Sequence, residues 1–332
     1  RTPRQHVGGC LWHSFDHQRG YHPDPFYGGL MDVFRQPKYS YYMFQAQRSP
    51  KKQDRLFETG PMVYIAHEMT PFSPKDVTVY SNCDEVRLTY NKGGKSLTYT
   101  KPVSREGMPS PIITFKDVYN FMIDKNMSMK EGRQKEVFLL AEGLINGKVV
   151  ATHKVCPARR PSKLLLWIDN ENTELKADGS DFVTVIAAIA DKNGNIKRLN
   201  NYYVKFHIEG EGRILGGANV LANPAPVKWG TAPILVQSTL KPGKIKITAS
   251  VLFEGSQMPV SAELELESKP SAYPLIYASE EAALIPMKSD SQSFPITAKS
   301  QKELEKEKAV KEQNERKLKE VEQQQADFGE KK

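Results

Sequence analysis

The sequence has few cysteines, and they are not arranged as a site. Its 332 residues contain three of them, Cys10, Cys83 and Cys156, which lie far apart and are odd in number. A disulfide framework or a CxxC metal site is therefore not indicated. The chain also lacks an apolar stretch of about 18 residues, the length expected of a membrane-spanning helix, so no membrane partner is expected.

Clustered basic residues are also missing, although the formal net charge is +8. Lysine and arginine are scattered, and basic runs stop at pairs such as Lys51-Lys52 and Arg159-Arg160. Without a basic patch or an aromatic-and-basic motif, nucleic acid is not expected as a partner. Hydrophobic residues make up 39% of the chain, with 14 Phe and 14 Tyr. This content and length are typical of about two domains with buried cores.

Residues 8–48 have the pattern of one strand, one loop and one helix. A short apolar run ends at Trp12 and gives way to a loop rich in His, Asp, Tyr and Pro. Pro37 fits the first turn of a helix. Four side chains then recur at helical spacing on one face, namely Tyr39, Tyr42, Met43 and Ala46. Because a buried parallel strand needs neighbours on both sides, we expect this unit to be the end of a larger β/α domain.

Residues 62–158 have the pattern of an antiparallel β-sandwich. Short runs rich in β-branched and aromatic residues recur there, and Asn91-Lys-Gly-Gly94 and Asn146-Gly147 are typical turn motifs. The predicted strands are 62–67, 76–80, 85–90, 96–100, 137–142 and 148–155. Between the fourth and fifth of them we expect the looser, Met-rich segment 104–134 to be an insertion.

Residues 162–268 predict a second sandwich, of immunoglobulin-like type. A proline-flanked boundary at 157–161 precedes it, and short strands alternate with Gly, Pro and Asn turns over about 100 residues. The predicted strands are 163–168, 182–190, 203–208, 233–237, 244–251 and 262–267. Asp191-Lys-Asn-Gly-Asn195 resembles a calcium loop, but its glycine comes two residues early, so we interpret it as a hairpin turn.

The remaining segments are polar. Residues 49–61 predict a linker, and residues 269–298 predict an extended linker with Pro and Ser but little periodicity. Residues 299–332 are rich in Glu, Lys and Gln, with opposite charges at i and i+4. Such pairs favour a charged, solvated helix. A coiled-coil partner for it is the alternative, although its apolar residues are too sparse for a heptad seam.

Three motifs in this order resemble glycoside hydrolase family 2, which contains β-galactosidases, β-glucuronidases and β-mannosidases. The last strand, loop and helix of that family's catalytic barrel are similar to Trp12-His-Ser-Phe-Asp16, Gly29-Leu-Met-Asp32 and Pro37-Lys-Tyr-Ser-Tyr-Tyr42. The sandwich that follows the barrel has a signature similar to 77–88, which includes Asn82. A further immunoglobulin-like domain of many bacterial members is similar to 175–181 and 212–216. The resemblance spans residues 8–268.

The resemblance implies a mainly β fold with a fixed order of parts. The last β/α unit of a TIM barrel would occupy 1–48, and two immunoglobulin-like β-sandwiches would follow. A charged C-terminal helix would end the chain. The family's bacterial members make the periplasm or the extracellular space plausible, but this sequence leaves the compartment unknown.

The implied activity is retaining hydrolysis of terminal β-glycosidic bonds, which needs two carboxylates. In the resembled family both are glutamates on earlier barrel strands, and residues 1–50 contain no glutamate. We therefore expect the C-terminal fragment of a β-galactosidase-like exo-β-glycosidase, without its catalytic pair and inactive by itself. The partners would be a β-galactoside-type carbohydrate and the missing N-terminal barrel and sandwich domains; no cofactor is expected. The alternative is a non-catalytic tandem β-sandwich protein that binds carbohydrate or is structural.

Three residues are the candidate substrate-binding set. The motif match makes Trp12 the aromatic wall of the glycone subsite, where an indole face stacks on a pyranose; the alternative is a core tryptophan. His13 and Asp16 are candidates for hydrogen bonds to sugar hydroxyls, with loop capping as the alternative for both. Weaker loop candidates are Arg19, Tyr21 and His22. The His13–His17 spacing is similar to a zincin pair, but that motif needs a helix and a glutamate base, so no metal is expected.

Overall fold

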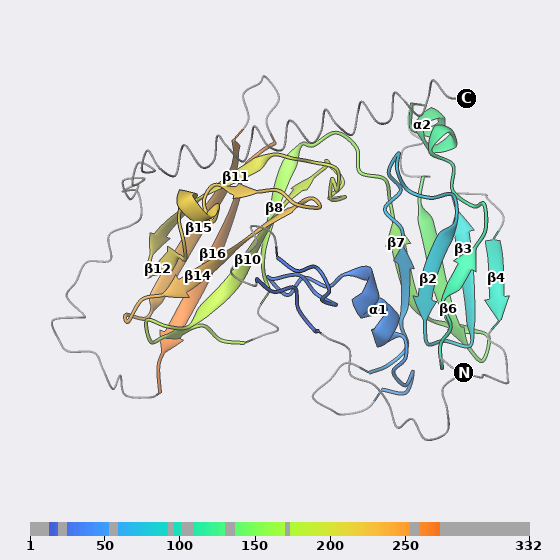
Figure 1. Cartoon of the computed structure of the whole chain (residues 1–332), viewed down its shortest axis with the longest axis horizontal. Helices are drawn as coiled ribbons and strands as arrows, with labels where there is room; N and C mark the ends of the chain where they lie inside the picture. Colours follow the sequence, from blue (N-terminus) through green and yellow to red (C-terminus); the bar gives the residue numbers. More distant parts are fainter. Residues whose placement is uncertain are drawn as a thin grey trace, which may run out of the picture.

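The computed structural model describes residues 13–18, 25–52, 59–91, 96–100, 109–129, 137–169, 173–252 and 259–272. Two β-rich units lie on either side of a small unit that carries helix α1 (Tyr39–Gln45) (Figure 1). The helix predicted after Pro37 is therefore confirmed. The strand predicted to end at Trp12 and the charged helix predicted at 299–332 lie outside the described residues. Within those residues, none of the helices has the length and apolar content needed to span a membrane.

The first sandwich has two antiparallel sheets that face each other across one core. Strands β1 (Val63–Ala66), β2 (Val77–Ser81) and β5 (Ile113–Phe115) form one sheet in that order. The other has the order β4-β3-β6-β7, built from β3 (Glu85–Tyr90), β4 (Ser96–Thr100), β6 (Leu139–Ile145) and β7 (Lys148–Val155). Alternate residues point inward, so that Val77, Val79, Val86 and Leu139 are fully buried. Burial of one face explains why the alternating sequence pattern predicted these strands.

One part of the first sandwich differs from the prediction. The segment 104–134, expected to be an insertion, contributes β5, which pairs with β2 through Val77 and Phe115, and also helix α2 (Phe121–Met129). Three residues are too few to show an alternation in sequence, and only the partner strand makes them a strand. By contrast, the predicted Asn146-Gly147 turn is confirmed, with φ values of 51° and 72°.

The second sandwich also has two sheets. One has the order β12-β14-β10-β8, and its strands are β8 (Lys163–Asp169), β10 (Phe182–Ala190), β12 (Gly212–Ile214) and β14 (Thr231–Ser238). The other has the order β13-β11-β15-β16-β9, with β9 (Lys176–Ala177), β11 (Tyr203–Gly210), β13 (Ala225–Pro226), β15 (Gly243–Leu252) and β16 (Ala262–Pro270). The core between them includes Val185, Phe206, Ile234, Ile245 and Ile247. The predicted mainly β architecture is thus confirmed.

Two further features follow from the register. Residues 191–195 form the predicted turn, because Asp191 N–H donates to the Asn195 carbonyl and Ala190 bridges Ile196. The last strand continues to Pro270, where it runs parallel to β9. Strands β9, β12 and β13 have only two or three residues, and no sequence pattern predicted them.

Asn82 fixes the segment that leads from α1 into the first sandwich. Its buried side chain donates to the carbonyls of Arg48 and Gly60, at 3.2 and 2.9 Å. Its Oδ1 accepts from the Met62 N–H at 2.8 Å. One amide therefore binds both ends of the connection to the edge of the sandwich, which gives the asparagine of the 77–88 motif a physical role.

We expect Asn82→Ala to lower the free energy of unfolding by about 2–3 kcal/mol, because it leaves buried backbone groups without partners. Urea unfolding followed by circular dichroism measures the change. Asn201 is exposed, and Asn201→Ala is the matched control, with an expected change within about 0.5 kcal/mol. Equal stabilities of the two variants would contradict this role of Asn82.

Candidate functional site

The candidate site is a loop whose two limbs are tied together by backbone hydrogen bonds. Asp16 N–H donates to the Met31 carbonyl at 2.9 Å, and Met31 N–H donates to the Ser14 carbonyl at 3.0 Å. Further along, His17 and Phe26 form an antiparallel bridge. The two described limbs of the loop, 13–18 and 25–32, are therefore paired with each other, although polar residues dominate their sequence.

Asp16 is the buried anchor of this loop. Its Oδ1 accepts from the Gly29 N–H at 2.9 Å and from Lys38 Nζ at 2.6 Å, and its side chain is 2% exposed. Lys38 also donates to the Tyr27 carbonyl at 3.2 Å. A Cβ on Gly29 would lie 2.3 Å from Asp16 N, so this close approach requires glycine. These contacts are those of the loop-ordering alternative for Asp16.

His13 has one ring nitrogen bound to the loop backbone and one without a partner among the described residues. Its Nδ1 lies 2.6 Å from the Phe15 carbonyl oxygen. A carbonyl only accepts, so Nδ1 carries the proton and Nε2 is the acceptor. Nε2 is buried and has no hydrogen-bond partner among the described residues. The ring packs edge-on against His17 at 4.3 Å and also contacts Phe26 at 5.5 Å.

The other candidate residues of the loop are not among those that the structure describes. Trp12, Arg19, Tyr21 and His22 lie outside the described residues. Asp32, which belongs to the 29–32 motif and was not a candidate, caps the 32–36 turn by accepting from the N–H groups of Phe34 and Gln36, while burial raises its pKa. No group of three His, Cys, Asp or Glu side chains in the described part of the chain is placed to hold a metal ion.

Helix α1 is joined to both sandwiches by Glu68, a residue that sequence reasoning missed. Tyr39, the first residue of α1, donates its hydroxyl to Glu68 Oε1 at 2.8 Å. Arg198, from the second sandwich, donates its Nε to Glu68 Oε2 at 3.1 Å. The Glu68 and Arg198 side chains are only 17% and 27% exposed. Burial, followed by the charge of Glu68, raises the pKa of Tyr39, so the phenol remains a donor.

An aromatic stack lies beside the contacts of Glu68 with Tyr39 and Arg198, which we call the Glu68 junction. The rings of Tyr42 and Tyr64 are parallel, 3.6 Å apart, and the Tyr64 ring also stacks on His153 at 4.5 Å. His153 Nδ1 accepts from the Ile65 N–H at 3.1 Å, so it carries no proton. Burial lowers the pKa of His153, and Glu68 offsets this in part. The stack therefore packs the half-buried Tyr42 of the helix on Tyr64, which in turn packs on a neutral imidazole.

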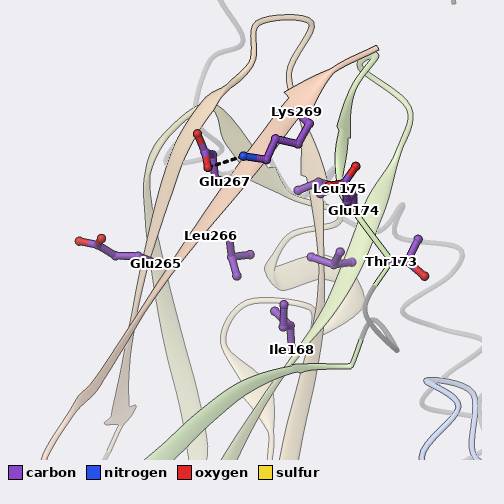
Figure 2. A pocket seen from close by; sticks show the side chains of 9 residues that line it. Ile168, Thr173, Glu174, Leu175, Glu265, Leu266, Glu267 and Lys269 are labelled. Atoms are coloured by element: carbon purple, nitrogen blue, oxygen red, sulfur yellow. Dashed lines mark hydrogen bonds and ion pairs between the residues drawn. The ribbon is translucent and has the colours of Figure 1, made fainter. Parts of the chain in front are cut away.

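A cavity of about 450 Å³ lies elsewhere, at one edge of the second sandwich (Figure 2). Ile168, Leu175 and Leu266 line it between β8, β9 and β16, and an ion pair of 2.7 Å between Glu267 and Lys269 lies at its rim. Neither His13 nor Asp16, the described candidates, lines this cavity. It is an opening between the two sheets of the sandwich.

Comparison with known proteins defines the class. Residues 166–252 match the family described as glycoside hydrolase family 2 C-terminal domain 5. The chain is 32% identical over 263 residues to a β-galactosidase of Thermoanaerobacter pseudethanolicus, covering 77% of this chain and 33% of that protein. It is 28% identical over 261 residues to β-galactosidase BoGH2A of Bacteroides ovatus, covering 73% of this chain and 27% of that protein. The chain thus spans about a third or less of the length of these relatives.

Solved structures show the same fold. A β-glycosidase from Bacteroides vulgatus superposes with a TM-score of 0.55 at 24% identity, over 76% of this chain and 30% of that one. A β-glucuronidase from glycoside hydrolase family 2 superposes with a TM-score of 0.53 at 22% identity, over 75% of this chain and 24% of that one. The resemblance to the C-terminal part of glycoside hydrolase family 2 enzymes is therefore confirmed. The chain carries a C-terminal domain of that family and is related in sequence to β-galactosidases.

A double-mutant cycle tests the Glu68–Arg198 ion pair. We expect Glu68→Gln and Arg198→Met to be coupled by about 1–2 kcal/mol in urea unfolding, because the pair is largely buried and Glu68 has a second donor. The exposed pair of Lys246 and Glu263 in the second sandwich is the matched control, with an expected coupling below about 1 kcal/mol. If both cycles gave the same small value, the junction would not depend on Glu68.

The junction should also be sensitive to pH. Because the pKa of His153 is lowered in the folded state, the unfolded state takes up more protons as the pH falls through about 6.5. The free energy of unfolding should therefore decrease between about pH 7 and pH 5. His153→Gln should reduce this dependence. An unaltered pH profile for His153→Gln would argue against a neutral buried imidazole.

Proposed function

We propose that this chain is the C-terminal part of a retaining exo-β-glycosidase that hydrolyses terminal β-galactoside-type bonds. One observation carries the proposal: helix α1, which follows the loop similar to a barrel end, is bound through Glu68 to both sandwiches. A binding protein made only of sandwiches would have no need for an ordered loop of this kind. The relatives named β-galactosidase support the choice of sugar.

In this proposal residues 1–48 are the terminal strand, loop and helix of a (β/α)8 barrel. A linker at 49–61 leads to the sandwiches at 62–158 and 162–268. An extended linker at 269–298 and a charged, solvated helix at 299–332 follow. The catalytic glutamates would come from the preceding barrel strands, and hydrolysis would proceed by double displacement through a glycosyl-enzyme intermediate.

The chain's own contribution is part of the wall of the glycone subsite. Residues that follow a barrel strand lie at the catalytic face. Trp12 would stack its indole on the C–H face of the terminal sugar and exclude water. His13 Nε2 would accept a hydrogen bond from a sugar hydroxyl, which its present tautomer allows. Asp16 would act by holding the loop in place, since its Oδ1 already binds Gly29 and Lys38.

The proposal is tested with the pure chain and with the product of the longer reading frame. We expect no turnover of nitrophenyl β-galactoside by the 332 residues, because they contain no catalytic pair in the barrel unit. The longer product should be active, and Trp12→Ala in it should lower kcat/KM by about tenfold or more, equivalent to about 1.4 kcal/mol of lost transition-state binding.

Trp12→Phe, which keeps an aromatic face, should retain most of the activity and serves as the control. Two results would overturn the proposal. The first is measurable turnover by the 332-residue chain, and the second is an upstream frame without two glutamate-bearing barrel strands.

A further inference from the structure

The turn that connects the two sheets of the second sandwich carries an unusual residue. Trp229 and Gly230 form a two-residue turn between Lys228 and Thr231, whose N–H and carbonyl groups exchange hydrogen bonds of 2.8 and 3.1 Å. The φ values are 52° and 83°, so both turn residues are in the left-handed region. A bulky residue is a genuine outlier in this region.

The same chain shows what such a turn normally contains. The turn between β6 and β7 has nearly the same φ values, 51° and 72°, and its residues are Asn146 and Gly147. Asn-Gly is the favoured pair because asparagine and glycine tolerate positive φ. At 229 the chain has tryptophan in the place of asparagine. Where a residue breaks a local rule without a packing gain, a functional role is the first explanation to test.

Packing does not account for Trp229. The residue is 54% exposed, and none of the described residues stacks on its indole. Met69, by comparison, also has a positive φ of 52° but is 2% exposed, so its side chain contributes to the core. A half-exposed indole in a strained turn gains no such burial.

The turn is held rigidly from two directions. Ile189 N–H donates to the Gly230 carbonyl at 3.1 Å, and Arg198 Nη1 donates to the Trp229 carbonyl at 3.1 Å. A Cβ on Gly230 would lie 2.7 Å from the Ile196 side chain, so the turn lies close against the neighbouring segment. The backbone is therefore fixed while the ring is presented to solvent, which lowers the entropy lost on binding.

The position of the turn follows from the junction. Arg198 also binds Glu68, and Glu68 binds Tyr39, the first residue of α1. In a (β/α)8 barrel, the helix after a strand begins on the side where the catalytic loops lie. If α1 is the last barrel helix, which rests on the proposed function, Trp229 lies beside the mouth of the active site.

We infer that Trp229 is a saccharide-binding residue, separate from the glycone subsite, that stacks on a pyranose ring of a β-linked galactan or galacto-oligosaccharide. The indole offers a flat apolar face of the kind that packs on the C–H face of a sugar ring. A single ring gives weak and rapidly reversible binding, and a polymeric substrate compensates because one bound unit keeps the others at high local concentration.

The experiment uses the whole 332-residue chain and does not depend on catalysis. Affinity electrophoresis in gels with soluble β-1,4-galactan should retard it, and Trp229→Asn should reduce the apparent affinity by about tenfold or more. Asparagine is the residue that this type of turn favours, so this variant should fold with an unchanged or higher melting temperature. Phe182→Ala removes a side chain from a residue that is 49% exposed on the same sandwich and should leave retardation unchanged.

Nuclear magnetic resonance supplies a direct second readout. The chain has three tryptophans, and a galacto-oligosaccharide should shift the indole N–H signal that disappears in Trp229→Asn. No retardation of the parent chain, or equal retardation of Trp229→Asn, would overturn the inference. Either result would leave the hydrolase proposal standing, since that proposal is measured as turnover by the longer protein.

Discussion

The carboxylate of Glu68 is the constraint on which the arrangement of the chain depends. Each of its oxygens is used by a different part of the molecule, one by Tyr39 at the start of α1 and the other by Arg198 of the second sandwich. The two bonds together restrict both the distance and the direction between α1 and the second sandwich. Because burial keeps Tyr39 a neutral donor, the carboxylate does not lose this partner at physiological pH. A single side chain of the first sandwich thus links the other two units to its own.

Helix α1 shows why such a constraint is needed. It has seven residues, no side-chain cap and no buried residue of its own, and isolated helices of this length are not stable in water. Its position is set by contacts at both ends. Tyr39 binds Glu68 at the beginning, and beyond the end Gln47 exchanges two hydrogen bonds with the backbone of Ser110 while Asn82 binds the Arg48 carbonyl. Polar contacts, supported by the Tyr42–Tyr64 stack, take the place of an apolar face.

The sequence predicted the features that repeat locally and missed those that depend on distant partners. Strands such as β2 and β15 bury every second residue, so their alternation was visible. Strand β5 has three residues and exists because β2 pairs with it. Glu68 and Arg198 are 130 positions apart, and neither has a neighbour that marks it. Asp16 was found as a candidate by its motif, but the cation that pairs with it, Lys38, is 22 positions away, and no pattern in the loop indicated that contact.

The polar character of the junction has a consequence for how the units work together. An apolar interface tolerates sliding, whereas a largely buried ion pair costs several kcal/mol if one partner is left unpaired. The Glu68 junction therefore favours one placement of the second sandwich over its neighbours more than it adds to the total stability. The backbone of Trp229 is bound to the same guanidinium that reaches Glu68, so a continuous series of hydrogen bonds connects the turn to α1. A ligand bound at the turn would thereby be connected through these hydrogen bonds to the helix that follows the loop of His13 and Asp16.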